Sequence, residues 1–218
     1  DDVTGTTEEK NDVKAQALAL RSFYYFHLVN MYGKPYSADK NALGVPLKLG
    51  SKLATTSVPR STVGEVYEQI VKDLLEAERL MKTLSGEVQV RRNKRVNLPF
   101  IQLLLSRVYL YMENWQKAME YAEMVINDYD YSIKDLNAVA EPDRNNSVSY
   151  PLYQTWDNPE VIFMLGDLND VISLAITSVR GSVIVGGRPI NKSMIVCVAS
   201  DDLINSYTPN DLRKTRYL

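Results

Sequence analysis

Aromatic side chains lie beside a polar run in the last third of the chain, and these residue types together could bind sugars. Tyr150, Tyr153 and Trp156 follow shortly after Asn146, which belongs to the polar run at 143–146. Aromatic rings stack on the apolar faces of sugars, while amides, carboxylates and guanidinium groups hydrogen-bond hydroxyls. The alternative is that each ring packs the loop onto neighbouring helices, which is the commoner role. We therefore name Tyr150, Tyr153, Trp156 and Asn146 as candidate glycan-binding residues.

Residues suited to catalysis are sparse. His27 is the only histidine, so sites that need several histidines have little material, and a structural role is expected for it. Carboxylates are abundant, and a pair of them can hydrolyse glycosides, but the pairing depends on a separation in space that sequence spacing does not give. The sequence predicts no catalytic residue and a protein that is not an enzyme, with glycoside hydrolysis as the minor alternative.

Two short runs resemble ligand-binding loops but lack a residue that each loop requires. The run that starts at Asp128 resembles the opening of a calcium loop, but Ile133 stands where glycine is needed. The run GSVIVGG at 181–187 resembles a phosphate-binding loop, but Gly187 occupies the lysine position. Cys197 is the only cysteine and cannot form an internal disulfide. We therefore expect no metal and no cofactor.

Charge and hydropathy exclude several broad classes of protein. The 218 residues carry 25 Lys and Arg against 27 Asp and Glu, so the whole chain does not attract nucleic acid or anionic lipid. The basic run RRNKR at 91–95 lacks interleaved aromatic residues and is interpreted as a solvated loop. No stretch approaches the ~20 apolar residues of a membrane span, and DDVTGTTEEK at the start is no signal peptide.

Amphipathic periodicity predicts two long helices in the first part of the chain. Residues 8–32 and 62–84 each carry an apolar stripe at helical spacing. Thr62 and Glu65 have the spacing of a capping box, which favours a helix start there. The connecting segment 34–60 is punctuated by proline and glycine and predicts a long ordered loop.

The stretch 98–129 predicts two more helices joined by a tight turn, with Asn97 and Asn114 as their caps. Apolar residues on the second helix recur at three and four positions, so this face is expected to pack against another helix. They are Trp115, Ala118, Met119, Ala122, Val125, Ile126 and Tyr129. Trp115 and Tyr109 match scaffold positions of the tetratricopeptide pattern, and both are expected in a packed core. No second copy of this pattern is visible about 34 residues away.

Helical periodicity fades after residue 130. Residues 161–165 are β-branched and aromatic and predict a short strand, 174–198 favours loops with a hairpin, and 200–207 predicts a short helix. The sequence therefore predicts a mostly α fold, with tetratricopeptide-like helical hairpins, long loops and a little β structure. We expect a helical scaffold over 1–135 and a loop-rich segment of the same domain over 136–218.

Six blocks of sequence, taken in order, resemble the SusD/RagB family of outer-membrane glycan-binding lipoproteins. They are AQALALRSFYYFHLVNMYG at 15–33, GVPL at 44–47, RSTVGEVYEQIVKDLLEAERL at 60–80, LLLSRVYLYMENWQKAMEYAEMVI at 103–126, NPEVIF at 158–163 and DDLINSYTPNDLR at 201–213. Each block is a weak pattern alone, and their order and spacing carry the resemblance. One departure is that Ala199 and Ser200 stand where the family usually has Pro-Ser.

The resemblance implies a SusD-like, non-enzymatic protein of the cell surface and outer membrane. Such a protein captures oligosaccharide or polysaccharide for a SusC-like TonB-dependent transporter, within a polysaccharide utilization system like that for starch. The resemblance also implies a lipid anchor on an N-terminal cysteine that this chain lacks, so we expect a central fragment of a family member. It transfers no binding residue, because the family's sugar platform is built from variable loops. The alternative is a tetratricopeptide-like adaptor that binds a protein segment in a groove lined by 15–32 and 98–129, without sugar.

Overall fold

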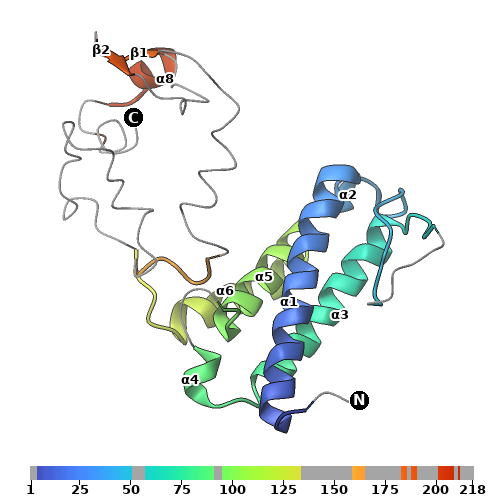
Figure 1. The fold of residues 1–218 in the computed structure, drawn as a ribbon. Coiled ribbons are helices and arrows are strands. Elements are labelled where there is room, and N and C mark those ends of the chain that lie inside the picture. Colours follow the sequence, from blue (N-terminus) through green and yellow to red (C-terminus); the bar gives the residue numbers. More distant parts are fainter. Residues whose placement is uncertain are drawn as a thin grey trace. The chain divides into compact units, whose positions relative to one another are not determined.

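Long helices make up most of the first of two compact units in the molecule (Figure 1). The computed structural model describes residues 4–50, 57–90, 95–133, 159–164, 183–185, 188–190, 201–208 and 211. The first unit comprises 1–131 and 161–163, and its helices are α1 (Thr7–Tyr32), α2 (Tyr36–Asp39), α3 (Val63–Met81), α4 (Gly86–Gln89), α5 (Leu98–Tyr111) and α6 (Trp115–Asn127). Within the described ranges, none of these helices combines the length and apolar character that a bilayer span requires. The mostly helical fold predicted from the sequence is confirmed.

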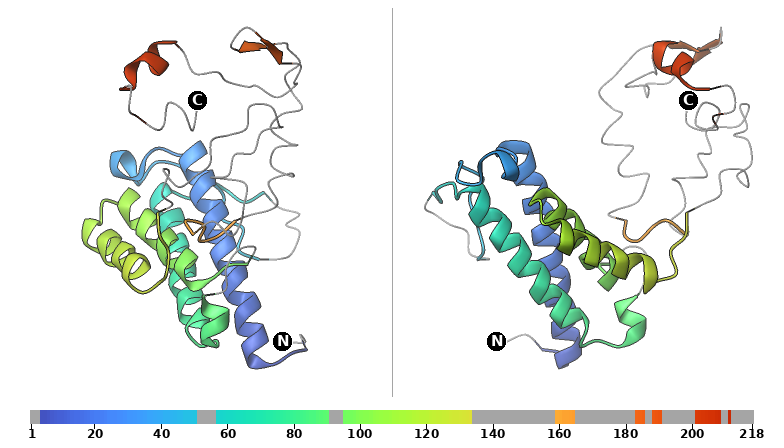
Figure 2. Two further views of the ribbon diagram at one scale, coloured as in Figure 1. Left: turned by 90° about the vertical axis from the view of Figure 1, so that its left-hand side faces the viewer. Right: turned by 180° about the vertical axis from the view of Figure 1, so that it is seen from behind.

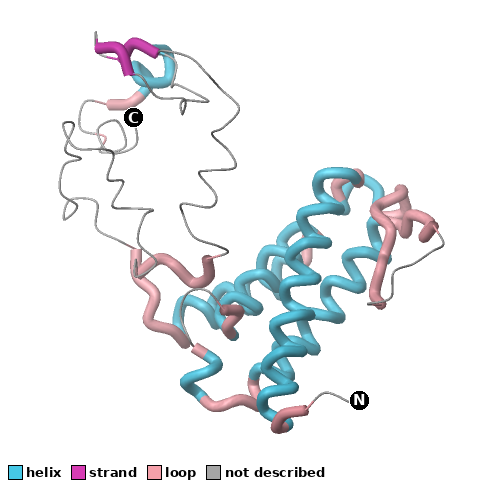
Figure 3. The backbone as a smooth tube through the Cα atoms, in the orientation of Figure 1, coloured by secondary structure: helices cyan, strands magenta, loops and turns pink. Residues whose placement is uncertain are grey.

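The second unit, Ser132–Glu160 with Met164–Leu218, contributes two strands and a short helix to the described residues (Figure 3). β1 (Val183–Val185) pairs with β2 (Arg188–Ile190) as an antiparallel hairpin. α8 (Asp201–Ser206) follows further along the chain. The hairpin expected within 174–198 and the helix expected at 200–207 therefore both form. The predicted boundary at residue 135 between scaffold and loop-rich segment stays a prediction.

α1 and α3 run side by side in opposite directions, and the segment between them connects neighbouring ends (Figures 1 and 2). Ala15, Ala19 and Ser22 on α1 are fully buried, and their small size lets the two helices approach closely. Ser22 Oγ donates a hydrogen bond of 3.3 Å to the Ile70 carbonyl on α3, which shows how near the two backbones lie. The α1–α3 pair therefore forms a closely packed layer that holds the segments around it.

Side-chain caps fix the starts of both helices. Thr62 Oγ1 accepts from the Glu65 N–H at 3.2 Å, while Glu65 Oε2 accepts from the Thr62 N–H at 2.7 Å. This is the predicted capping box, which pairs two backbone donors that the helix itself cannot satisfy. Thr6 and Glu9 build the same arrangement at the start of α1.

α5 and α6 form the predicted helical hairpin. Asn97 Oδ1 accepts from the Phe100 N–H at 2.9 Å, and Asn114 Oδ1 accepts from the Lys117 N–H at 3.3 Å, so both predicted caps are confirmed. Glu113 in the tight turn has a left-handed backbone, with φ of 59°. Ser106 Oγ donates to the carbonyl of α6 residue Ala118 at 2.7 Å, which joins the two helices. Tyr109 is buried, as expected.

One face of α6 is not covered by any described element. Trp115, Met119 and Ile126 are 62%, 57% and 71% exposed. Ala118 and Val125, which lie on the other side of the apolar stripe, are buried. The prediction that the whole stripe packs was therefore wrong for three side chains, and Trp115 does not lie in the core. The physical reason is that the stripe is wider than the contact with a single neighbouring helix.

The segment 161–164 is not the strand that its composition predicted. Its Ile162 carbonyl accepts from Asn97 Nδ2 at 2.9 Å, and the ring of Phe163 lies 4.3 Å from that of Phe100 between centroids. These contacts attach Ile162 and Phe163 to the start of α5. A β-branched and aromatic run forms a strand only where a neighbouring strand pairs with it, and here α5 is the neighbour instead.

A partly buried polar network joins α3, α5 and α6. The Glu78 carboxylate accepts from Lys82 Nζ at 2.7 Å, from the Tyr121 hydroxyl at 3.2 Å and from Gln102 Nε2 at 3.3 Å. The Tyr129 hydroxyl donates to Gln102 Oε1 at 2.7 Å. Burial raises the pKa of Tyr129 to about 12, so its phenol stays protonated and donates at every ordinary pH.

Candidate functional site

The glycan-binding residues predicted from the sequence, Tyr150, Tyr153, Trp156 and Asn146, lie outside the described residues, so their role stays a prediction. His27 is described and lies exposed on α1, with its ring centroid 4.5 Å from that of Phe23. Within the described parts of the chain, no group of three or more His, Cys, Asp or Glu side chains is placed to hold a metal ion.

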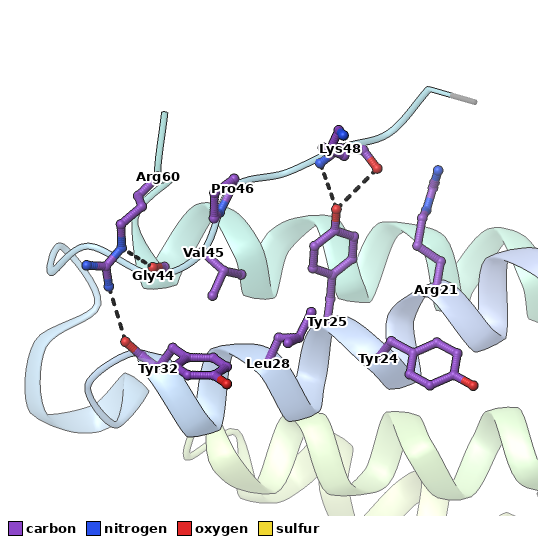
Figure 4. A pocket seen from close by; sticks show the side chains of 10 residues that line it. All are labelled: Arg21, Tyr24, Tyr25, Leu28, Tyr32, Gly44, Val45, Pro46, Lys48 and Arg60. Carbon is purple, nitrogen blue, oxygen red and sulfur yellow. Dashed lines mark hydrogen bonds between the residues drawn. The ribbon is translucent and has the colours of Figure 1, made fainter. Parts of the chain in front are cut away.

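An open groove of about 730 Å³ runs along α1 and is the candidate site among the described residues (Figure 4). One side consists of Tyr24, Leu28 and Tyr32, which follow each other along α1. The other side is the extended segment 44–48, with Arg60 near its start. The remaining lining residues from α1 are Arg21 and Tyr25.

The phenol of Tyr25 fastens the extended segment to α1. Its hydroxyl accepts from the Lys48 N–H at 2.7 Å and donates to the Lys48 carbonyl at 3.1 Å. In a sheet a neighbouring strand would satisfy these two backbone groups, and here one buried side chain does so. The backbone at Lys48 is therefore fixed while its side chain points out to solvent, as its exposure shows.

Arg60 holds the other end of the segment. Its Nε donates to the Gly44 carbonyl at 2.6 Å, and its Nη2 donates to the carbonyls of Leu43 at 2.9 Å and Tyr32 at 3.1 Å. The Gly44 N–H donates to the Ser61 carbonyl at 2.7 Å, and a Cβ at position 44 would lie 3.2 Å from that oxygen. A side chain at position 44 would therefore be crowded by the backbone of residues 61 and 62.

Arg21 lines the groove, and its charge is neutralised by an ion pair with Asp73. Its Nε and Nη2 donate to the two carboxylate oxygens of Asp73 at 2.7 and 2.8 Å, and its Nη1 donates to the Leu49 carbonyl at 3.1 Å. The hydrogen bond with Asp73 raises the pKa of Arg21. Gln69 Nε2 also donates to Asp73, at 2.8 Å. This cluster ties together α1, α3 and Leu49, which follows the extended segment.

The side chains that line the groove are aromatic, apolar and cationic. Tyr24 and Tyr32 are 51% and 64% exposed and offer ring faces together with hydroxyl groups. Among the described residues that line the groove there is no histidine and no carboxylate. Its charged lining residues are Arg21, Lys48 and Arg60, all of them cations.

A sequence signal for this groove existed and was missed. Tyr24, Leu28 and Tyr32 are spaced by four residues, so they lie on one face of a helix. That face is distinct from the buried one, which contains Ala15 and Ala19. A second apolar stripe on one helix indicates that a second element packs along that helix. No local sequence pattern predicted that segment 44–48 lies along that stripe.

Known proteins similar to this chain cover most of its length. It is 28% identical over 176 residues to SusD-like protein P2 of Formosa agariphila, an alignment that covers 78% of this chain and 32% of that protein. A SusD superfamily protein from Bacteroides thetaiotaomicron has a similar crystal structure, with 31% identity, a TM-score of 0.62 and coverage of 74% and 32%. A SusD-like carbohydrate binding protein from Bacteroides vulgatus matches with 26% identity, a TM-score of 0.62 and coverage of 82% and 36%.

The family match covers the part of the chain that builds the groove. The chain spans about a third of the length of the relatives it matches. Residues 2–110, half of the chain, match the SusD-like family described as starch-binding and associating with the outer membrane. That range contains α1, the extended segment, α3 and nearly all of α5. With its helical scaffold and its solved structural relatives in agreement, the chain belongs to this SusD-like family.

Proposed function

We propose that this chain is part of a cell-surface protein that captures oligosaccharides or polysaccharides for import through a SusC-like TonB-dependent transporter. The observation that carries the proposal is the match of residues 2–110 to a starch-binding family associated with the outer membrane. The groove beside α1 supports it, because exposed tyrosine rings next to hydrogen-bond donors suit sugar rings. The candidate contacts Tyr150, Tyr153, Trp156 and Asn146 belong to the same proposal.

The proposed activity is binding without hydrolysis. Most glycoside hydrolases use two carboxyl groups that flank the scissile bond, and no carboxylate is among the described residues that line the groove. Incubation with each bound glycan should release no reducing sugar. Release that disappears on mutation of one Asp or Glu would make the protein a hydrolase and would contradict this part of the proposal.

The central test is isothermal titration of the protein with a panel of plant, host and microbial glycans. We expect saturable binding to at least one glycan class. A matched set of variants, Tyr150→Ala, Tyr153→Ala and Trp156→Ala, tests the predicted contacts, with Tyr207→Ala as the aromatic control outside the cluster. Absence of binding across the whole panel would contradict the proposal.

The proposed place of the protein is the outer face of the outer membrane, held there by acyl chains on an N-terminal cysteine of the intact protein. Labelling with a radioactive fatty acid should mark the intact protein, and mutation of that cysteine should remove the label. Pull-down from outer-membrane extracts should recover a barrel transporter.

A second candidate is the tetratricopeptide-like adaptor that binds a protein segment. The observation in its favour is the open apolar face of α6, with Trp115, Met119 and Ile126. Against it, the groove beside α1 is lined by α1, the extended segment 44–48 and Arg60, and no residue of 98–129 is among its lining residues. The same pull-down separates the two candidates, because an adaptor should recover a protein partner in place of a transporter, and should bind no glycan.

A further inference from the structure

Two cations in the groove beside α1 have no acidic partner among the residues that the structure describes. Arg60 donates only to neutral backbone carbonyls, and no carboxylate of the described residues forms an ion pair with it. Lys48 makes neither an ion pair nor a side-chain hydrogen bond within the same part of the structure, and its side chain is exposed. Arg21 differs from both, because Asp73 neutralises it. The groove is therefore locally positive although the chain as a whole has a formal net charge of −2.

These cations retain donors for a ligand. A guanidinium group carries five N–H donors, and the three bonds of Arg60 to carbonyls use Nε and Nη2, so no described residue accepts from Nη1. The ammonium of Lys48 keeps all its donors. Hydrogen bonds from such groups to an anion are shorter and stronger than those to a neutral hydroxyl. The open donors therefore favour a negatively charged ligand group over a neutral one.

Aromatic rings lie along the groove beside the two cations. Figure 4 shows Arg60 beside Tyr32, Lys48 at the hydroxyl of Tyr25, and Tyr24 further along α1 near Arg21. Tyr24 and Tyr32 are eight residues apart on α1, which corresponds to roughly 12 Å along the helix. Leu28 lies between them and adds an apolar surface. An extended ligand with ring-shaped units and acidic substituents matches this order of groups better than a compact anion does.

We propose that the groove beside α1 binds an acidic oligosaccharide. Its carboxylate or sulfate groups meet Lys48 and the free donors of Arg60, and its sugar rings lie against Tyr24 and Tyr32. This inference rests on the proposed function, and it assigns to that function a ligand class and a binding surface. Because the two cations are exposed, their attraction for the ligand weakens as salt rises.

The test compares three probes by isothermal titration with the full chain: maltohexaose, which is neutral, oligogalacturonate, which carries carboxylates, and a sulfated galactan oligosaccharide. We expect one or both acidic probes to bind about ten-fold or more tightly than the neutral one at low salt, and to weaken on raising NaCl from about 0.05 M to about 0.5 M. Preference for one acidic probe identifies which anionic group is recognised. Equal binding of all three, or salt-independent binding, would overturn the proposal.

Matched variants locate the surface. Lys48→Ala should weaken acidic binding about five-fold, and Tyr32→Ala about ten-fold. Their controls are Lys72→Ala on α3 and Trp115→Ala on α6, which are exposed and lie outside the groove, and should leave affinity unchanged. Thermal unfolding of each variant checks that the fold is kept, as expected for exposed side chains.

Each failure has a distinct meaning. If Lys48→Ala and Tyr32→Ala leave binding intact while the variants at 150, 153 and 156 abolish it, the groove is not the site and this inference is wrong, but the proposed function stands. If none of the three probes binds while another glycan of the panel does, the ligand class is wrong. If nothing in the panel binds, the inference and the proposed function fail together.

Discussion

α3 and α6 are equally amphipathic in sequence and very differently placed in the structure. Both begin at a side-chain cap and both carry apolar residues at three- and four-residue spacing. α3 packs between α1 and α5 and buries ten of its residues, whereas α6 has α5 as its main neighbour and buries two. The periodicity of a helix therefore identifies an apolar face, and the number of neighbouring elements decides how much of that face is buried.

The largest expected effect compares the same substitution on the two helices. Ile70→Ala on α3 should lower the free energy of unfolding by about 2–5 kcal/mol, because the side chain is fully enclosed and its removal leaves a cavity. Ile126→Ala on α6 should change it by less than about 0.5 kcal/mol. Urea unfolding followed by circular dichroism measures both. An equal cost at the two sites would mean that the open face of α6 is covered in solution, and the contrast would fail.

The next effect concerns Asp73, a buried carboxylate on α3 that has no counterpart on α6. Asp73→Asn should destabilise the protein by about 2–4 kcal/mol, because Arg21 loses its counter-charge and an amide nitrogen replaces one acceptor. The double variant Arg21→Met, Asp73→Leu should recover part of this loss, since no buried charge then remains unpaired. The same urea measurement, with the single variants Arg21→Met and Asp73→Leu added, gives the coupling through a double-mutant cycle. A double variant that is less stable than Asp73→Asn would contradict this account.

Removal of the N-terminal cap should cost the two helices about the same stability. Thr62→Ala and Asn114→Ala should each cost about 1 kcal/mol, because a cap acts on backbone groups of its own first turn and does not depend on what covers the apolar face. Thr62→Ser and Asn114→Asp keep an accepting oxygen and should lose less. If Asn114→Ala leaves stability unchanged while Thr62→Ala lowers it, α3 and α6 differ in the strength of their caps as well as in burial.

The smallest effect is a pH dependence on the solvent side of α3. Hydrogen bonds from Arg79 and then Lys14 lower the pKa of Glu76 from 4.5 to about 2. Its stabilising contribution is therefore complete above pH 4.5 and is lost as the pH falls towards 2. Melting temperatures of the natural protein and Glu76→Gln should differ slightly at neutral pH and converge near pH 2. Glu68→Gln, an exposed α3 glutamate without an ion pair in the described ranges, is the control. A difference that persists at pH 2 would exclude this origin.

Local chemistry made much of the scaffold predictable. Thr62 with Glu65, Asn97 and Asn114 mark helix starts because a side-chain oxygen accepts from a backbone donor within three residues. The hairpin of α5 and α6 followed from the period of its apolar residues. The ordered blocks at 15–33 and 60–80 placed the chain in its family, as the match over 2–110 bears out.

The errors all concern contacts between distant parts of the chain. Trp115 was expected in the core and is exposed, because no described element covers that side of α6. Phe163 was expected in a strand and lies on Phe100. The groove was not anticipated, since it exists only where the segment 44–48 lies along α1. The glycan contacts predicted at 146–156 remain predictions.

The sequence by itself determined the helices, their caps and the family, because these depend on interactions within one turn or on the order of short blocks along the chain. Only the tertiary structure decided that Tyr25 satisfies both backbone groups of Lys48, that Arg60 holds the Gly44 carbonyl, and that a groove opens between them. The physical reason is that a side chain's burial and charge balance are set by its neighbours in space, and those neighbours lie 16 to 23 residues away along the chain.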